Sequence, residues 1–206
     1  MRISKLAPSQ RKQGRWLVWL DSGDLLRLGE SEVVAFALYA GMELEEETLA
    51  ALKKAAGTAQ YKEYALNALS ARPMSCQELR QKLEGKGCAT EQAGEITGRL
   101  AELGYLNDAD YARTVVKHYT AKGYGPYKIR EELHRRGVPR EFWEEALAQR
   151  EDPADALDAF IERKLGRMEN PDRKDLKRVS DALARRGYAW SEISAALRRF
   201  GAHTED

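Results

Sequence analysis

The sequence has few of the residues from which metal centres, disulfide frameworks and membrane spans are built. Its 206 residues include two cysteines, Cys76 and Cys88, and three histidines, His118, His134 and His203, none of them spaced as a set of metal ligands. We therefore expect reduced thiols, solvent-facing histidines, no metal and no cofactor. No run approaches the roughly 20 apolar residues that cross a bilayer, and the N-terminus lacks the apolar core of a secretory signal. These absences predict a cytoplasmic protein without a membrane partner.

Motifs for nucleotide binding or catalysis are also missing. No glycine-rich phosphate loop ends in Gly-Lys, and Gly123-Tyr124-Gly125 is too short for a dinucleotide fingerprint. That tripeptide instead indicates a helix end before Pro126. Carboxylate pairs such as Glu131-Glu132 stand beside basic residues in an amphipathic segment, where acid-base catalysis would also need a desolvated cleft. We expect a protein that is not an enzyme.

Charge is plentiful but balanced. Charged residues make up 33% of the chain and apolar residues 43%, while the net charge is only +1. The apolar content can build folded cores, but the composition gives no bulk attraction to nucleic acid. Locally the balance breaks, because residues 30–52 hold six acidic and no basic side chains, whereas residues 122–140 hold six basic and two acidic. Most such charges belong to solvated helix faces.

The first thirty residues differ from the rest of the chain. Two apolar runs, residues 15–20 and 25–28, flank the turn-forming tetrad Asp21-Ser22-Gly23-Asp24. This pattern predicts a β-hairpin. Because an isolated hairpin is only marginally stable, we expect its tryptophans to pack on the following helix or the hairpin to pair with another chain.

A pattern of two apolar residues and a glycine recurs three times at intervals of fifty residues. The copies are Leu79, Leu83 and Gly87, then Ile129, Leu133 and Gly137, then Val179, Leu183 and Gly187. Spacings of four place the apolar residues on one helix face, and the glycine closes the helix in a left-handed cap. Another amphipathic segment follows each copy and a third precedes it. The sequence therefore predicts three units of three helices each.

Signals for helix ends are frequent outside the repeat as well. Glycines that follow apolar-periodic stretches, and that we interpret as C-caps, are Gly41, Gly57, Gly87, Gly104, Gly123, Gly137, Gly187 and Gly201. Ser75-Cys76-Gln77-Glu78 has the form of a capping box, and Pro126 suits the first turn of a helix.

Together these signals predict a mainly α fold in which tandem three-helix repeats form an elongated, curved array after a small N-terminal β-hairpin and helices. The expected organisation is an N-terminal segment at residues 1–57 and repeats at residues 58–107, 108–152 and 153–206. Stacked repeats offer a long surface to a partner.

Several stretches resemble the signatures of a known family. They are Ala71-Arg72-Pro73-Met74-Ser75-Cys76-Gln77-Glu78-Leu79, Gly104-Tyr105-Leu106-Asn107-Asp108-Ala109-Asp110-Tyr111-Ala112, Gly123-Tyr124-Gly125 with Lys128-Ile129-Arg130-Glu131-Glu132-Leu133 and Arg136-Gly137-Val138, and Arg185-Arg186-Gly187-Tyr188 with Ile193. They are similar to the RecX family, the modulators of the RecA recombinase, from about Tyr61 to Phe200. The long, charged connector at residues 162–176 departs from the family pattern.

This resemblance implies a non-enzymatic regulator that binds in the groove of the RecA filament and mostly inhibits recombinase, ATPase and coprotease activity. It also implies that the protein acts in DNA repair and the SOS response, with the RecA filament as its partner. Single- or double-stranded DNA is a further candidate partner. We expect the regulator itself to be a monomer.

Clustered arginines are the best candidates for binding, because a guanidinium donates two parallel hydrogen bonds to a carboxylate or a phosphate. Neighbouring tyrosines are able to anchor an interface or stack on a base. The predicted partner- or DNA-binding residues are Lys128, Arg130, Arg135, Arg136, Lys177, Arg178, Arg185, Arg186, Arg198, Arg199, Tyr124 and Tyr127.

Two other functions remain open from the sequence. The segment from Ser75 to Leu106 also reads as helix, turn, helix, which is typical of a protein that binds duplex DNA without RecA. A scaffold for an unrelated partner is the third interpretation.

Overall fold

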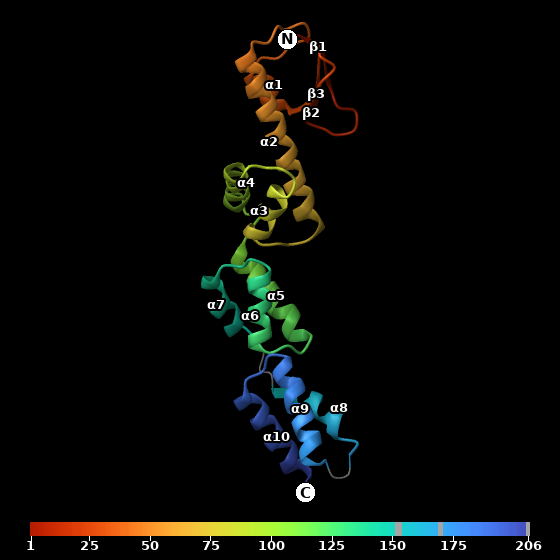
Figure 1. Ribbon diagram of the computed structural model, residues 1–206, viewed down its shortest axis with the longest axis vertical. Helices are drawn as coiled ribbons and strands as arrows, with labels where there is room; N and C mark the ends of the chain where they lie inside the picture. Colours follow the sequence, from red (N-terminus) through yellow and green to blue (C-terminus); the bar gives the residue numbers. More distant parts are fainter. Residues whose placement is uncertain (151–153, 169–170, 205–206) are drawn as a thin grey trace. The chain divides into compact units, whose positions relative to one another are not determined.

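The computed structural model describes residues 1–150, 154–168 and 171–204, and its elements are labelled in Figure 1. The strands are β1 (Ile3–Pro8), β2 (Arg15–Leu20) and β3 (Leu25–Gly29). The helices are α1 (Glu30–Ala35), α2 (Glu46–Ala71), α3 (Cys76–Glu84), α4 (Thr90–Glu102), α5 (Asp108–Ala121), α6 (Pro126–Arg135), the 3-10 helix η1 (Arg140–Phe142), α7 (Trp143–Ala148), α8 (Ala154–Leu165), α9 (Arg173–Arg185) and α10 (Trp190–Thr204). The predicted mainly α fold with a small N-terminal β element is confirmed.

The N-terminal sheet is antiparallel, with strand order β1-β2-β3. The predicted hairpin is its β2-β3 pair, in which Trp19 lies opposite Leu25 and Arg15 opposite Gly29. The additional strand β1 pairs with the other edge of β2. One face of the sheet is apolar and packs with α1 and α2, where Val18 and Leu28 are buried and Trp16 is partly buried.

Helix α2 runs through Gly57, so the predicted helix end at that residue is wrong. Gly201 likewise lies inside α10. Good helix formers surround Gly57, and the cost of about 1 kcal/mol for glycine in a helix is too small to break a 26-residue helix. Gly41 has a positive φ angle but caps no helix, because α1 ends at Ala35 and the Gly41 amide donates to the Ile3 carbonyl, so that prediction is also wrong. The remaining predicted cap glycines have positive φ angles at helix ends: Gly87, Gly104, Gly123, Gly137 and Gly187.

The chain divides into two compact units, which we describe separately. The first contains residues 1–72 and 79–99, and the second contains residues 73–78 and 100 onward. In the first unit, the apolar residues that hold the later helices together include Ala65, Leu79, Leu83 and Ile96, all buried.

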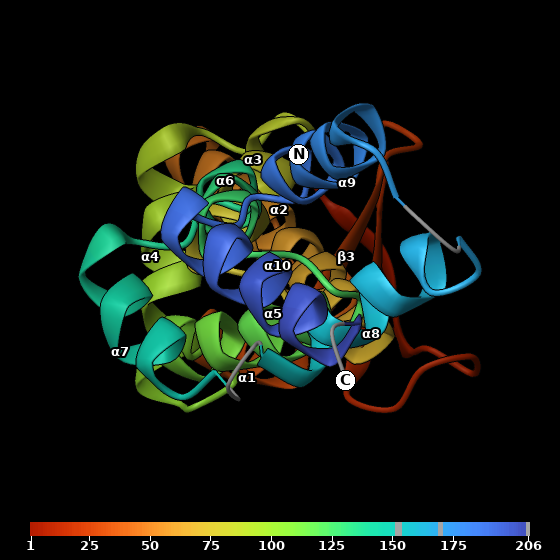
Figure 2. The same ribbon diagram turned by 90° about the horizontal axis from the view of Figure 1, so that it is seen from below.

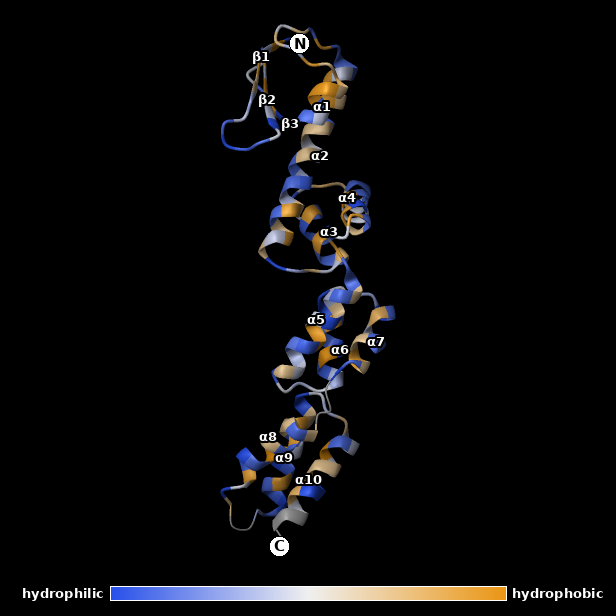
Figure 3. Cartoon of the chain, turned by 180° about the vertical axis from the view of Figure 1, so that it is seen from behind, coloured by the Kyte–Doolittle hydropathy of each residue, from blue (hydrophilic) through white to orange (hydrophobic). Residues whose placement is uncertain are grey.

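The second unit contains two three-helix repeats, each with its own core. Helices α5, α6 and α7 enclose Val115, Ile129 and Leu133, and helices α8, α9 and α10 enclose a second cluster that includes Ile161 and Leu183. Figure 2 shows the latter three helices from the C-terminal side, and Figure 3 shows the mixture of apolar and polar residues along each amphipathic helix. The second and third predicted repeats are therefore packed units, while residues of the first predicted repeat are divided between the two compact units.

The repeat glycines close their helices by the same pair of backbone hydrogen bonds. The amide of Gly137 donates to the His134 carbonyl at 2.9 Å, and the next amide, of Val138, donates to the Leu133 carbonyl at 3.0 Å. This is the Schellman motif, which requires a left-handed residue, and the φ of Gly137 is +66°. Gly87 and Gly187 close their helices in the same way.

Candidate partner-binding surface

Two junctions within the second unit share one recurring contact, in which the segment that begins a repeat's second helix touches the end of the next repeat's second helix. At the start of α3, the Ser75 hydroxyl accepts from the Glu78 amide at 3.0 Å and donates to the Arg136 carbonyl at 2.5 Å. Fifty residues later, at the start of α6, the Gly125 amide donates to the Arg186 carbonyl at 2.8 Å. The serine half of the predicted capping box is therefore confirmed, and it also serves the junction.

The second of these junctions brings two backbones unusually close. The Tyr127 amide donates to the Gly187 carbonyl at 3.1 Å. A Cβ atom built on Gly125 would lie 2.3 Å from that carbonyl oxygen, which is closer than real Cβ contacts. Glycine is required here for close approach, which places the exposed start of α6 directly beside the end of α9.

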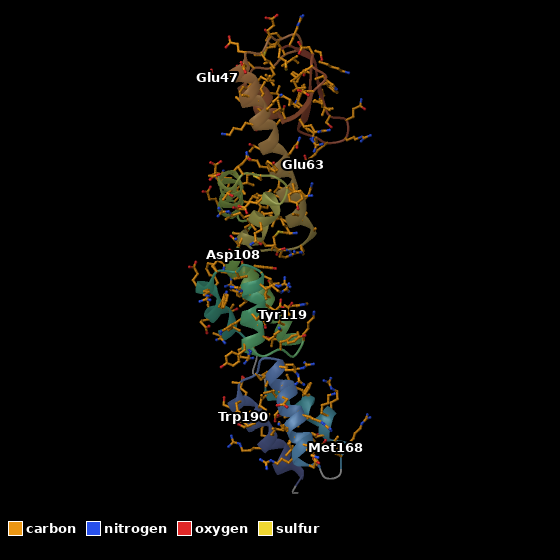
Figure 4. The ribbon with its side chains drawn as sticks, viewed as in Figure 1. Glu47, Glu63, Asp108, Tyr119, Met168 and Trp190 are labelled. Carbon is orange, nitrogen blue, oxygen red and sulfur yellow. The ribbon has the colours of Figure 1, made fainter. Side chains whose placement is uncertain are left out.

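Two of the predicted binding residues, Arg136 and Arg186, make contacts inside the chain at these junctions. The Arg136 guanidinium donates to two hydroxyls of α5, that of Tyr111 at 2.8 Å and that of Tyr119 at 3.3 Å. Figure 4 labels Tyr119. Although burial alone would lower the pKa of Arg136, these hydroxyl contacts raise it above its usual value. The predicted contact of Arg136 and Arg186 with a partner stays a prediction.

Arg186 has a different set of contacts. Its guanidinium donates to the Gly123 carbonyl at 3.1 Å and lies 4.8 Å from the centre of the Phe160 ring and 5.9 Å from that of Tyr124. Tyr124 is half-buried and packs against Tyr119, with 5.6 Å between ring centres. Tyr124, predicted as a binding residue, is thus largely part of the junction.

Two further arginines are held by carboxylates in a forked geometry. Arg130 of α6 donates to both oxygens of Glu144 in α7 at 3.1 and 3.0 Å, and Arg199 of α10 donates to both oxygens of Asp158 in α8 at 2.9 and 2.7 Å. These pairs join helices of the same repeat.

The remaining predicted residues lie at the surface. Tyr127 is 63% exposed, and the Arg135 and Arg178 side chains are 64% and 79% exposed despite single carboxylate partners, Glu132 and Asp175. Lys128 is half-buried and contacts Glu131 at 2.7 Å. Within the described part of the chain, no ion pair is found for the exposed residues Lys177, Arg185 and Arg198.

We group six of these residues of α6 and α9 under the name α6-α9 surface: Tyr127, Lys128, Arg135, Lys177, Arg178 and Arg185. The fifty-residue repeat makes Lys128 equivalent to Arg178 and Arg135 to Arg185, so cations occupy the same helix positions in both repeats. The Gly125 junction places Tyr127 and Lys128 beside the end of α9, where Arg185 lies. Arg198 lies on α10 and is not part of this surface.

Sequence reasoning missed one residue of this surface. Lys174 is exposed on α9, three and four residues before Lys177 and Arg178, and therefore on the same helix face. The available signal was the spacing of three and four residues from Lys174 to Lys177 and Arg178. Lys174 lies in the connector at residues 162–176, which departs from the family pattern.

Other chemistry finds little support among the described residues. No group of three or more His, Cys, Asp or Glu side chains there has a metal-binding arrangement, and no described helix is long and apolar enough to span a membrane. Burial, and then the nearby Asp108 carboxylate, raise the pKa of the Cys76 thiol to about 11, so it is a weak nucleophile. His118 and His134 are exposed as predicted, and the His203 side chain lies outside the described residues.

Comparisons with known proteins agree with this architecture. Residues 62–100, 107–147 and 150–197 match the models of the first, second and third three-helix domains of RecX. The regulatory protein RecX of Trichlorobacter lovleyi is 37% identical over 132 residues, which cover 60% of this chain and 84% of that protein. RecX of Xanthomonas citri is 35% identical over 135 residues, covering 65% and 83%.

Solved structures share the fold. A crystal structure of regulatory protein RecX superposes with a TM-score of 0.77 at 24% identity, covering 96% of this chain and 98% of that one. RecX from Lactobacillus salivarius gives a TM-score of 0.66 at 21% identity, covering 71% and 97%. With three tandem three-helix domains matched in order and relatives aligned over most of their length, this chain belongs to the RecX family of regulatory proteins.

Proposed function

We propose that this protein binds in the groove of the RecA filament and inhibits RecA as recombinase, ATPase and coprotease, acting in the cytoplasm without chemistry of its own. Family membership carries the proposal, because the relatives are named regulatory proteins and this chain has all three of the family's helical domains. The α6-α9 surface is the part of the chain that we assign to the contact.

The charge of this surface supports a partner rich in carboxylates or phosphates. Its exposed guanidinium groups suit planar, bidentate acceptors. Their existing partners are surface carboxylates, and exposed ion pairs contribute only about 0–1 kcal/mol each, so a partner displaces them at little cost. Tyr127, exposed beside the cations, is the type of residue that anchors protein interfaces.

The junction arginines give this surface its geometry. Arg186 bonds to the turn at Gly123 of the preceding repeat, and the Gly125 and Tyr127 amides bond to the end of α9, so Arg185 keeps a fixed position relative to Tyr127 and Lys128. A periodic polymer such as a protein filament is matched best by charges at a fixed repeat, since preorganised groups lose less entropy on binding.

The test is inhibition of DNA-stimulated ATP hydrolysis by RecA. Reversing the surface charges in the triple variant R135E/R178E/R185E should weaken inhibition at least ten-fold, while circular dichroism stays unchanged because none of these side chains is buried. The matched control is K117E/K164E, which reverses exposed charges on α5 and α8 outside the α6-α9 surface. Equal inhibition by the triple variant and the wild type would reject the surface.

The same titration separates the rival interpretation. A duplex-binding protein that acts without RecA binds DNA alone with a steep salt dependence, whereas a filament regulator inhibits at substoichiometric ratios only when RecA is present. If the wild-type protein leaves RecA activity unchanged, the proposed function fails.

A further inference from the structure

The outer face of the N-terminal sheet lies outside the apolar core, and of its residues Arg15 pairs with Glu63 of α2. Strand alternation and register place seven residues on it, and none of them belongs to the apolar cluster that the inner face builds with α1 and α2. The seven are Lys5, Ala7, Arg15, Leu17, Trp19, Leu25 and Arg27. Three of them are basic and none is acidic.

The centre of this face is apolar. Trp19 stands in a cross-strand row between Lys5 and Leu25, and Leu17 stands in the next row between Ala7 and Arg27. Trp19 and Leu17 are half-buried, and the Lys5 ammonium lies 5.1 Å from the centre of the Trp19 ring. An aromatic ring and a leucine side by side, flanked by cations, form a platform on which planar groups are able to stack.

A basic hollow of about 300 Å³ adjoins this platform, on the side where Arg27 lies. Its charged lining is Lys12, Arg15, Arg27 and Lys62 together with two carboxylates, Glu32 of α1 and Glu63 of α2, the second of which Figure 4 labels. Glu63 pairs with Lys12 at 2.9 Å and also with Arg15. Burial opposes the ionisation of Glu63, yet these two cations hold its pKa below the usual value. The ionised carboxylate therefore sits where the phosphate of a ligand would contact Lys12 and Arg15.

Most acidic residues of residues 30–52 lie away from this face, although Glu32 lines the adjoining hollow. The six carboxylates of residues 30–52 lie on α1, on the segment after it and at the start of α2. These helices pack against the inner face of the sheet. The outer face of the sheet itself carries three cations and no carboxylate, so its local charge is complementary to a polyanion.

We propose that the outer face of the β1-β2-β3 sheet binds a single strand of DNA. Bases stack on Trp19 and Leu17, while phosphates contact Lys5 and Arg27 and extend toward Lys12 and Arg15 in the hollow. A single strand is favoured over a duplex because only unpaired bases expose the flat faces that an apolar platform contacts. This site requires neither RecA nor the α6-α9 surface.

The experiment measures fluorescence anisotropy of a labelled oligothymidylate with the full chain, over a range of salt concentrations and without RecA. Replacing Trp19 by leucine keeps the strand apolar but removes stacking, and should weaken binding about ten-fold without changing the salt slope. Arg27→Gln should lower the slope of log K against log salt by about 0.7, the contribution of one phosphate contact on a single strand. The matched controls are Trp190→Leu, at an exposed tryptophan of the second unit, and Lys54→Gln on α2.

Glu63→Gln is the most discriminating variant, because it removes the competing carboxylate and should tighten binding several-fold. A protein whose loop merely needs Glu63 for structure would bind more weakly instead. Equal affinity for a duplex, or for inorganic polyphosphate of matched charge, would overturn the proposal, as would a Trp190→Leu effect equal to that of Trp19→Leu. Because RecA is absent, failure here leaves the proposed regulation of RecA standing, and loss of that regulation leaves this site standing.

Discussion

The junction between the second and third repeats should not tolerate a single methyl group at Gly125. The residue has φ −82° and ψ 171°, a backbone conformation that alanine adopts without strain. A Cβ atom there, however, would lie 2.3 Å from the Gly187 carbonyl oxygen and 2.5 Å from the Tyr188 nitrogen. Any destabilisation by Gly125→Ala therefore comes from the close approach of two backbones and not from the dihedral angles.

The magnitude follows from what the methyl group displaces. If the backbones separate, the bonds from the Gly125 and Tyr127 amides to Arg186 and Gly187 are lost, at about 0.5–1.5 kcal/mol each. If they stay together, the overlap costs about 1–3 kcal/mol, as overpacking of interiors does. We expect a loss of about 2 kcal/mol in the free energy of unfolding.

Urea unfolding measures this loss, and hydrogen exchange at the Gly125 and Tyr127 amides locates it. The matched control is Gly98→Ala inside α4, where a Cβ atom meets nothing within 4 Å. There alanine should stabilise the protein by up to about 1 kcal/mol through its higher helix propensity. If Gly125→Ala unfolds at the same urea concentration as the wild type, with both amides still protected, the junction is not as close as described.

Three further outcomes are expected. Ser75→Ala should lower the free energy of unfolding by about 1–2 kcal/mol, because it removes both the α3 cap and the bond to Arg136; Ser75→Thr should retain most of it. Burial opposes ionisation of Glu132, but Arg135 and Tyr119 lower its pKa. The ionised carboxylate therefore stabilises the fold fully above the unfolded-state pKa, and this stabilisation is lost as the pH falls through the lower folded-state pKa. Glu132→Gln should flatten the decline in urea midpoint between pH 7 and pH 3. Asp108→Asn should speed alkylation of Cys76 at pH 8, because it removes the carboxylate that, after burial, raises the thiol's pKa; an unchanged rate would contradict that cause.

Sequence reasoning succeeded where a structure depends on neighbours along the chain. The β2-β3 hairpin followed from two apolar runs around a turn, and the ends of α3, α4, α5, α6 and α9 followed from glycines with positive φ. Strand β1 was missed because its partner begins only at residue 15 and its own alternation is broken by the irregularity between Ile3 and Lys5. Gly57 misled because a glycine in a stable helix looks, locally, like a glycine that ends one.

Adjacent arginines show the limit most clearly. Arg135 and Arg136, like Arg185 and Arg186, are equivalent in composition and charge, and sequence alone placed all four on the partner surface. The structure separates them, because the residue after the last helical turn points back toward the neighbouring helix. Arg136 reaches tyrosines of α5 and Arg186 reaches the turn at Gly123, while Arg135 and Arg185 remain exposed.

By itself, the sequence determined the three-helix repeats, their fifty-residue spacing and the glycines that end their second helices, because periodicity and helix caps are local properties of a few consecutive residues. Only the tertiary structure decided which cations face solvent, how closely Gly125 approaches Gly187, and which sheet face carries Trp19 with Lys5 and Arg27. Those features depend on contacts between residues far apart in the chain, up to 63 positions for Gly123 and Arg186, and such contacts are fixed by packing and not by any pattern within one segment.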